Sequence, residues 1–177
     1  AITYTSHAQT KNFINLIKEN IIGKITTINV TFGFKVKKVN PKSRLFDKSL
    51  GGGVILDVGC YPISFLNLIC PNNENIEFEN VKGSFSNTGV EDFAEANLIL
   101  GNNIKANIKI SFKENLENKI IVEGESGSLI LSNPWLPEIK SFIEVNHKNS
   151  HYKKFIISNK SVYANQIQNI SATINDK

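Results

Sequence analysis

The first 36 residues change from helical to strand periodicity. Apolar side chains over 6–23 recur every three or four positions, and Ser6 with Gln9 three residues later matches a capping box. A helix is therefore predicted from Ser6 to a stop at Gly23. Over 28–36 apolar and polar residues alternate, which is the period of a strand with one buried face.

A strongly apolar stretch follows, opened by three consecutive glycines at 51–53 and running to Cys70. Its length of about 18 residues exceeds that of a strand and predicts a buried helix. Pro62 removes the hydrogen bond to the carbonyl of Val58, so we expect a bend near Gly59. No apolar run nears the roughly 20 residues of a membrane span, so no membrane partner is expected.

From residue 76 onward the pattern is one of short strands separated by turns. The clearest strand alternates apolar residues with lysine, asparagine and serine, and it follows a Gly-Asn-Asn turn. A helix is predicted from about Ser161. The fold class is therefore α+β, with a large, mainly antiparallel open sheet and two or three helices on one face. The predicted strands cover 76–89, 92–100, 104–113, 118–124, 128–131, 139–146 and 151–158.

Length and composition favour one domain over residues 1–177. The chain has 177 residues, 41% of them hydrophobic and 20% charged, which excludes a disordered or fibrous protein. The first residues show no secretory signal. Cys60 and Cys70 are separated by about 15 Å along the predicted helix, whereas a disulfide needs Cα atoms within about 7 Å. Reduced thiols favour a cytoplasmic location.

The net charge of +4 is interpreted as a solubility feature. The densest basic stretch, 35–48, is interpreted as a charged loop rather than a phosphate track, so nucleic acid is not an expected partner. His147 and His151 have a spacing that serves a metal on a helix, but their segment predicts two strands joined by a polar turn. No metal site is therefore predicted.

Asp57 and Tyr61 are the candidate chemical groups of the apolar stretch. They are four residues apart and would project from one face of the predicted helix. Burying a carboxylate and a phenol is costly unless both meet partners or water. Two interpretations stay open: both are satisfied in the core, or both face a cleft where the phenol exchanges a proton with a substrate hydroxyl that the carboxylate orients.

The glycines at 51–53 also have two interpretations. They form either a sharp turn with positive φ into the helix, or a close approach of the backbone to a ligand at the helix N-terminus. Their spacing is not Gly-x-Gly-x-x-Gly, and no strand leads directly into them. A dinucleotide fingerprint is therefore excluded.

Several motifs resemble one enzyme family. The run LGGGVILDVGCYPI at 50–63 closely resembles the signature of the C-terminal domain of the Gfo/Idh/MocA oxidoreductases, such as glucose-fructose oxidoreductase and inositol dehydrogenase. Segments 3–9, 22–25 and 122–128 resemble its opening Tyr-Arg-x-His-Pro-Gln, its Ile-Gly-x-Ile and its later Gly-x-x-Gly turn. The resemblance implies a dihydrodipicolinate reductase-like C-terminal domain. It also implies hydride exchange between NAD or NADP and the carbon of a sugar or polyol alcohol.

The resemblance also implies site residues. Tyr61 would transfer the proton, as in the branch of glucose-fructose oxidoreductase, dihydrodiol and xylose dehydrogenases, where many other members carry histidine. Asp57 would position the substrate, and Arg44, the single arginine, would hold substrate or cofactor oxygens. His7 and Tyr4 would line the same cleft. The resemblance assigns no cofactor-binding residue within this chain.

Departures from the family pattern shape the functional expectation. Family members carry a nucleotide-binding Rossmann domain before this point, ending in a Lys-Pro motif, and neither is present in the 177 residues. We expect the substrate-binding and oligomerisation half of an NAD(P)-dependent oxidoreductase, inactive alone. The alternative is a free-standing, non-catalytic sugar-binding or assembly module. Thr5 and Ala8 stand where the family usually has Arg and Pro, which leaves the substrate class open.

The expected partners are a small sugar or polyol and a second copy of the chain. The polar face with Lys105, Lys109 and Lys113 is either solvated or covered by another subunit, since family members commonly associate through the open sheet.

Overall fold

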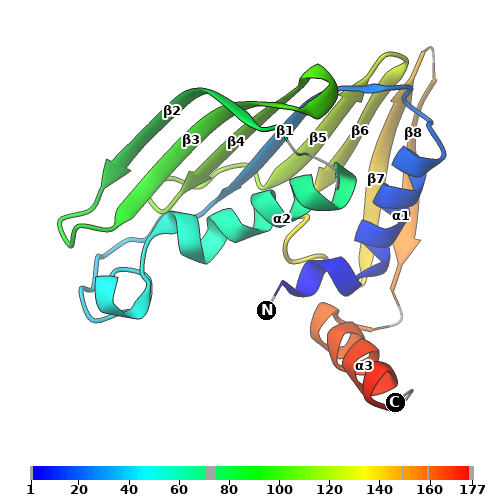
Figure 1. Cartoon of the computed structure of the whole chain (residues 1–177). Helices are drawn as coiled ribbons and strands as arrows, with labels where there is room; N and C mark the ends of the chain where they lie inside the picture. The colour runs from blue at the N-terminus through cyan, green and yellow to red at the C-terminus, as the bar shows by residue number, and fades with distance from the viewer. Residues whose placement is uncertain (1, 71–74, 149, 159, 176–177) are drawn as a thin grey trace. The chain divides into compact units, whose positions relative to one another are not determined.

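The computed structural model describes residues 2–70, 75–148, 150–158 and 160–175, and eight strands lie within them. The chain divides into two compact units: unit 1 comprises 1–25 and 120–177, and unit 2 comprises 26–119. Each unit supplies four strands of an open, mainly antiparallel sheet, which confirms the predicted fold class (Figure 1). That the whole chain acts as one substrate-binding domain stays a prediction.

Unit 2 arranges its four strands in the order β2-β3-β4-β1. Neighbours β2, β3 and β4 are antiparallel, whereas β1 lies parallel to β4 with Val30 opposite Ile108. The turn between β3 and β4 is a 3-10 segment at Gly101–Asn103, and Asn103 adopts a φ of 59°. The strands are β1 (Ile25–Gly33), β2 (Glu77–Phe85), β3 (Glu91–Leu100) and β4 (Ile104–Ser111).

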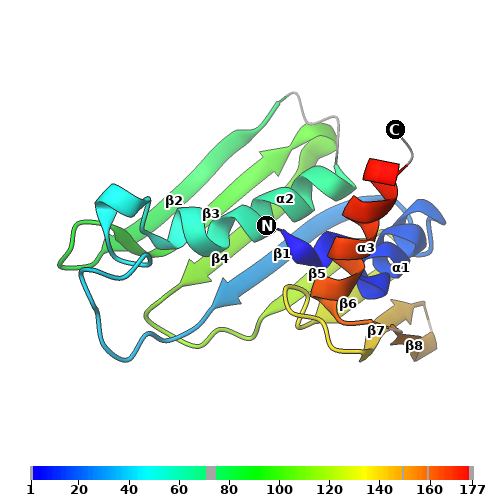
Figure 2. The same ribbon diagram turned by 90° about the horizontal axis from the view of Figure 1, so that it is seen from below.

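The core of unit 2 lies between these strands and helix α2 (Cys60–Ile69), which crosses β3 and β4 in Figure 2. In β4, Ala106, Ile108 and Ile110 are buried, while Lys105 and the other polar residues occupy the opposite face. The period-two pattern predicted for this segment is confirmed because only one face of the strand meets a helix.

The predicted helix over 51–70 has two parts. A π-helix, η3 (Ile55–Gly59), precedes α2. Pro62 has no N–H to donate to the carbonyl of Val58, so α-helical bonding is interrupted at the point expected. The irregularity is a change of helix type, of the kind frequently found at functional sites.

The apolar stretch is longer than the sequence pattern suggested. By length and composition alone, the 22 residues Lys48–Ile69 suffice to cross a membrane. The core helix of a soluble protein passes the same test, and Val58, Phe65 and Leu66 are buried inside unit 2. The stretch is therefore weak evidence for a membrane span.

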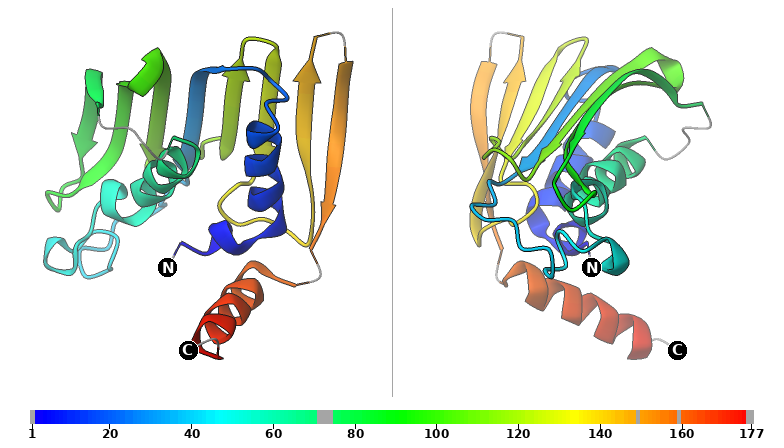
Figure 3. Two further views of the ribbon diagram at one scale, coloured as in Figure 1. Left: turned by 45° about the vertical axis from the view of Figure 1, so that its right-hand side comes forward. Right: turned by 90° about the vertical axis from the view of Figure 1, so that its left-hand side faces the viewer.

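Unit 1 places its strands in the order β5-β6-β7-β8, and α1 packs on β7 and β8 (Figure 3). Phe13 and Leu16 of α1 are buried, as are Ile143 and Val145 of β7. Both strands around the two histidines are confirmed; residue 149 of their turn lies outside the described residues. The elements are η1 (Thr3–Ser6), α1 (Ala8–Lys18), β5 (Lys119–Gly124), β6 (Gly127–Ser132), β7 (Lys140–His147), β8 (Ser150–Ile157) and α3 (Val162–Asn175).

The bounds of the first helix correct the sequence prediction. Its N-cap is His7 rather than Ser6, because the chain forms the 3-10 turn η1 first and the His7 side chain accepts the N–H of Gln9. The helix ends at Lys18, before Gly23, because Asn20 adopts a φ of 57° and leaves the helical conformation.

Candidate functional site

The three glycines of unit 2 form the turn that leads into η3. Gly51 and Gly53 adopt φ values of 71° and 121°, which side chains rarely tolerate. Gly52 instead lies against the backbone, since a Cβ there would stand 2.8 Å from the carbonyl oxygen of Asp47. A Cβ on Gly53 would overlap the carboxylate of Glu91. Gly52 and Gly53 therefore disfavour any other residue, by close backbone contact and by an extreme φ respectively, and the left-handed φ of Gly51 favours glycine.

The same turn offers no cradle to a dinucleotide. The N–H groups of Gly51, Gly52 and Gly53 donate to the carbonyls of Lys48, Asp47 and Leu45 at 2.9–3.2 Å. Phosphate binding by a glycine-rich loop needs free N–H donors. Of the two interpretations of the glycine run, the structure supports the turn, and no cofactor would be held by these groups.

Arg44 and Asp57 form an ion pair within unit 2. Arg44 Nη1 donates to Asp57 Oδ1; the Arg44 side chain is 72% exposed and that of Asp57 is 14% exposed. The hydrogen bond from the guanidinium to Asp57 and the charge of Asp57 raise the pKa of Arg44, and the negative form of Tyr61 acts in the same direction. The structure thus brings together three of the five predicted site residues.

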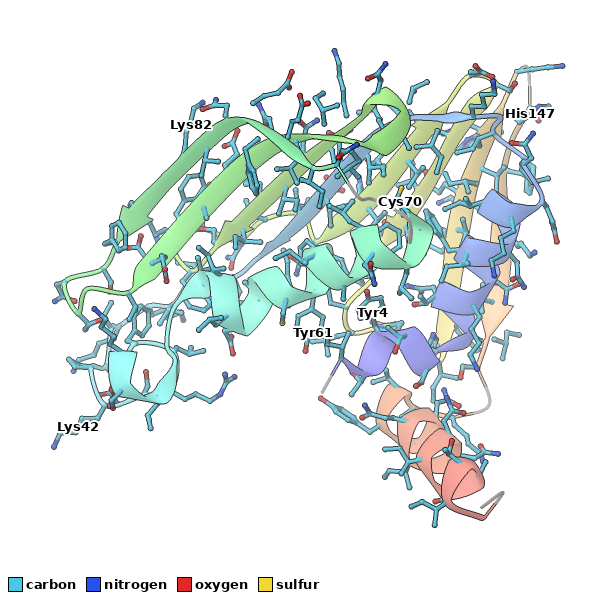
Figure 4. The ribbon with its side chains drawn as sticks, viewed as in Figure 1. Tyr4, Lys42, Tyr61, Cys70, Lys82 and His147 are labelled. Carbon is cyan, nitrogen blue, oxygen red and sulfur yellow. The ribbon has the colours of Figure 1, made fainter. Side chains whose placement is uncertain are left out.

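Tyr61 stands in the first turn of α2, half-buried (Figure 4). Its ring packs edge-on against Phe32 of β1, with centroids 5.2 Å apart and planes at 85°. The apolar ring of Tyr61 therefore packs on the strand. This is usual for tyrosine, which combines an apolar ring with a polar hydroxyl.

Gly59 and Cys60 complete the start of the helix. A Cβ on Gly59 would lie 3.0 Å from Ile110 Cδ1, so glycine permits the close approach of η3 to β4. Burial raises the pKa of the Cys60 thiol, and the charge of Asp57 raises it further. The thiol therefore stays protonated and unreactive near neutral pH. Among the described residues, neither Cys60 nor Cys70 takes part in a disulfide.

Tyr4 and His7 lie in unit 1 and are fully buried. Tyr4 packs edge-on against Trp135, with ring centroids 5.3 Å apart. Nδ1 of His7 accepts the N–H of Gln9 at 3.1 Å, and burial lowers the pKa of His7. Within the described residues, His7 Nε2 has no hydrogen-bond partner. A role for Tyr4 and His7 in substrate binding stays a prediction.

Sequence reasoning missed the supporting residues. Phe32 was expected on the buried face of a strand, but nothing in the sequence indicated that its ring would pack against the ring of Tyr61. Glu91 beside Gly53 and Trp135 beside Tyr4 are brought in from distant segments, so no local pattern could reveal them.

The grouping of a phenol, a carboxylate and a guanidinium suits proton transfer to or from a bound hydroxyl. A tyrosine oxygen can donate or accept a proton, and a carboxylate can orient a hydroxyl by accepting its hydrogen bond.

Comparison with known proteins gives a family match. The model of the GFO/IDH/MocA C-terminal domain matches residues 11–130. The trans-1,2-dihydrobenzene-1,2-diol dehydrogenase of Xenopus tropicalis is 31% identical over 123 residues, which are 69% of this chain and 36% of that protein. The human enzyme of the same name is 26% identical over 124 residues, 70% of this chain and 36% of that protein.

Solved oxidoreductases share the fold at low sequence identity. The 3-ketoreductase KijD10 of Actinomadura kijaniata, in complex with NADP and TDP-benzene, aligns with a TM-score of 0.85 at 17% identity, covering 99% of this chain and 53% of that one. An aldose-aldose oxidoreductase of Caulobacter crescentus, complexed with glycerol, gives 0.84 at 19% identity, covering 98% and 52%. The chain spans about a third of the curated relatives and about half of these structures.

Proposed function

Because the chain belongs to the GFO/IDH/MocA C-terminal domain family, we propose that it is the substrate-binding half of an NAD(P)-dependent oxidoreductase acting on a hydroxyl or carbonyl of a sugar or polyol. The observation that carries the proposal is the grouping of Arg44, Asp57 and Tyr61 where η3 passes into α2. The dehydrogenase relatives and the neighbours solved with NADP and with glycerol support it.

Tyr61 is the proposed proton-transfer residue. In its ionised form the phenolate oxygen takes the proton of a substrate hydroxyl on oxidation and becomes a phenol, and the phenol returns that proton on reduction. The Arg44 guanidinium stabilises negative charge that develops on that oxygen during the transfer. A nicotinamide cofactor, when bound, exchanges the hydride.

Asp57 is the proposed positioning group for the substrate. Its carboxylate keeps acceptor capacity beyond the one hydrogen bond from Arg44 and can orient a second hydroxyl of a polyol. Arg44 fixes the carboxylate because a charge-assisted hydrogen bond holds its direction. Tyr4 and His7 of unit 1 stay candidates for substrate binding.

The test compares turnover of the chain alone with that of a fusion to the nucleotide-binding portion of the Xenopus tropicalis relative. We expect no turnover of polyols with NAD or NADP by the chain alone. In the fusion, Tyr61→Phe should lower turnover by roughly 10²- to 10⁴-fold, the usual contribution of a positioned proton donor. The matched control is Tyr163→Phe, since Tyr163 is 60% exposed on α3.

Two results would contradict the proposal. Turnover by the chain alone would remove the need for a second half. Full turnover by the Tyr61→Phe fusion would remove Tyr61 from the chemistry. Sugar binding by the chain together with no turnover by the folded fusion would support the alternative, a non-catalytic sugar-binding module.

Association with a second copy is also part of the proposal. In unit 1 the face of β7 and β8 opposite α1 carries Phe142 paired with Phe155, and Phe155 is 74% exposed. Ile157 on the same face is 70% exposed. Exposed aromatic and aliphatic side chains grouped in this way are typical of protein interfaces. We propose a homo-oligomer of this chain in the cytoplasm, a location supported by two cysteines that take part in no disulfide among the described residues.

A further inference from the structure

The basic residues of the chain concentrate in one loop of unit 2. Residues 34–50 hold six of the 20 lysine and arginine residues and one of the 16 acidic residues, so their formal charge is +5 against +4 for the whole chain. The remainder of the chain is therefore slightly acidic. We name 34–50 the basic loop; its cationic members are Lys35, Lys37, Lys38, Lys42, Arg44 and Lys48.

The basic loop is anchored at both ends. Phe34 and Phe46 both pack on Phe112, with ring centroids 5.3 Å and 5.7 Å apart. Phe46 is buried, and the N–H of Lys35 donates to Asn115 Oδ1 at 2.8 Å. The lysines therefore project from a backbone whose base is fixed, which lowers the cost of gathering them around a ligand.

The lysines of the basic loop have no carboxylate partners among the described residues. The ion pairs found there join Arg44 to Asp57, and other lysines to Glu114, Glu117 and Glu144. Asp47, the acidic residue of the loop, is engaged elsewhere: its Oδ1 accepts the N–H and the hydroxyl of Ser49. The five lysine side chains are exposed. A loop that carries several exposed cations without counter-charges attracts anions.

Arg44 belongs to both the basic loop and the candidate catalytic group, so the loop adjoins Asp57 and Tyr61. We infer that the basic loop binds a phosphate group of the molecule that reacts at Tyr61. This inference rests on the proposed function and narrows it. The phosphate belongs either to a phosphorylated sugar or polyol substrate or to the nicotinamide cofactor. Lysine ammonium groups suit the role because they neutralise phosphate as mobile point charges.

Calorimetric titration of the full chain tests the inference. The probes are inorganic pyrophosphate, glucose 6-phosphate against glucose, and NADP against NAD, at about 50 and 200 mM salt. We expect pyrophosphate to bind, and at least one phosphorylated probe to bind at least tenfold more tightly than its counterpart. Affinity should fall as salt screens the charges. A preference for the sugar phosphate assigns the loop to the substrate, and a preference for NADP assigns it to the cofactor.

Matched triple variants locate the binding. Lys37→Ala/Lys38→Ala/Lys42→Ala should weaken binding of the phosphorylated probe at least tenfold. Lys82→Ala/Lys105→Ala/Lys140→Ala removes the same charge from exposed lysines outside the loop and should change binding less than about twofold. Thermal unfolding of both variants checks that they fold. Equal losses in the two variants, or no binding of any phosphate probe, would overturn the inference.

Two further measurements distinguish phosphate binding by the basic loop from the proposed function and from nucleic-acid binding. If no phosphate probe binds while Tyr61→Phe lowers turnover in the fusion, the proposed function stands and the inference falls. Loop-dependent, salt-sensitive binding of a short DNA duplex without binding of pyrophosphate or sugar phosphate would overturn it in favour of nucleic acid.

Discussion

Arg44 and Asp57 are joined across the glycine turn, although thirteen positions separate them in the sequence. The turn brings the end of the basic loop back beside the first residues of η3, and the guanidinium bonds to the carboxylate there. Because Arg44 is 72% exposed, water screens the pair. Its main effect is therefore to orient the carboxylate rather than to stabilise the fold.

The Arg44–Asp57 pair should contribute little to stability. A double-mutant cycle with Arg44→Ala and Asp57→Asn, followed by urea unfolding, should give a coupling free energy below about 1 kcal/mol. The control is Lys48→Ala combined with Asp57→Asn, since the structure records no ion pair of Lys48 within its described part; its coupling should be near zero. A coupling above about 2 kcal/mol would show that the pair is a structural element instead.

A side chain at Gly53 should be more costly than one at an open turn. Gly89→Ala places a Cβ at φ 80° with nothing within 4 Å, so it should cost only the left-handed strain of about 1–2 kcal/mol. Gly53→Ala combines a φ of 121° with overlap on the Glu91 carboxylate and should cost more. Adding Glu91→Ala should recover part of the loss. Equal unfolding free energies for the two alanine variants would refute the assigned overlap.

Acid should destabilise unit 1 through His7. Burial lowers the pKa of His7 below 6.5, so between the two pKa values the unfolded chain binds more protons than the folded chain. The contribution of neutral His7 is complete above about pH 6.5 and is lost as the pH falls through the lowered pKa. Protonation also removes the Nδ1 acceptor that caps α1 at the N–H of Gln9.

Replacing His7 with asparagine isolates this titration. Asparagine keeps a side-chain acceptor at the cap but does not titrate. Unfolding free energy measured by urea from pH 7.5 to 5 should fall more steeply in the wild type than in His7→Asn. His151→Gln, at an exposed position of β8, is the control and should keep the wild-type slope. Parallel curves for wild type and His7→Asn would exclude a role for His7 in the acid response.

The exposed aromatic pair of unit 1 gives a prediction for assembly. Phe155→Ser should shift the sedimentation coefficient toward that of the monomer, because it removes the most exposed ring of the proposed interface. Tyr152 is 45% exposed on the same strand but pairs with Val145, which places it on the other face. Tyr152→Ser should leave assembly unchanged. A wild-type chain that sediments only as a monomer at high concentration would end the proposal.

Periodic segments of the fold were predictable from the sequence because burial imposes their period. The alternation in β4 and the apolar spacing in α1 each come from one face meeting the core. The element ends were less predictable. The cap at His7 and the early stop at Asn20 are settled by single side-chain and backbone conformations that no periodicity encodes.

The candidate site also has features that the local sequence predicts and features that it does not. The spacing of Asp57 and Tyr61 identified a candidate pair of groups but left their surroundings open, and their chemical role stays a prediction. Arg44 was expected to hold ligand oxygens, and its bond to Asp57 depends on the course of the loop between them. The packing of Phe32 on Tyr61 and of Glu91 on Gly53 depends on the pairing of strands far apart in the chain, which local sequence does not specify.

The parallel pairing of β1 with β4 sets the order in which unit 2 can fold. Strands β2, β3 and β4 are consecutive hairpins and can form from local contacts, whereas Asn29 meets Asn107 only after a 78-residue separation is closed. Such long-range closure is slow because the chain loses conformational entropy before the contacts between the two strands can offset that loss. The basic loop, the glycine turn and Tyr61 all lie inside this closure. We therefore expect the candidate site to take its final geometry late, because the first strand of the unit is expected to join last.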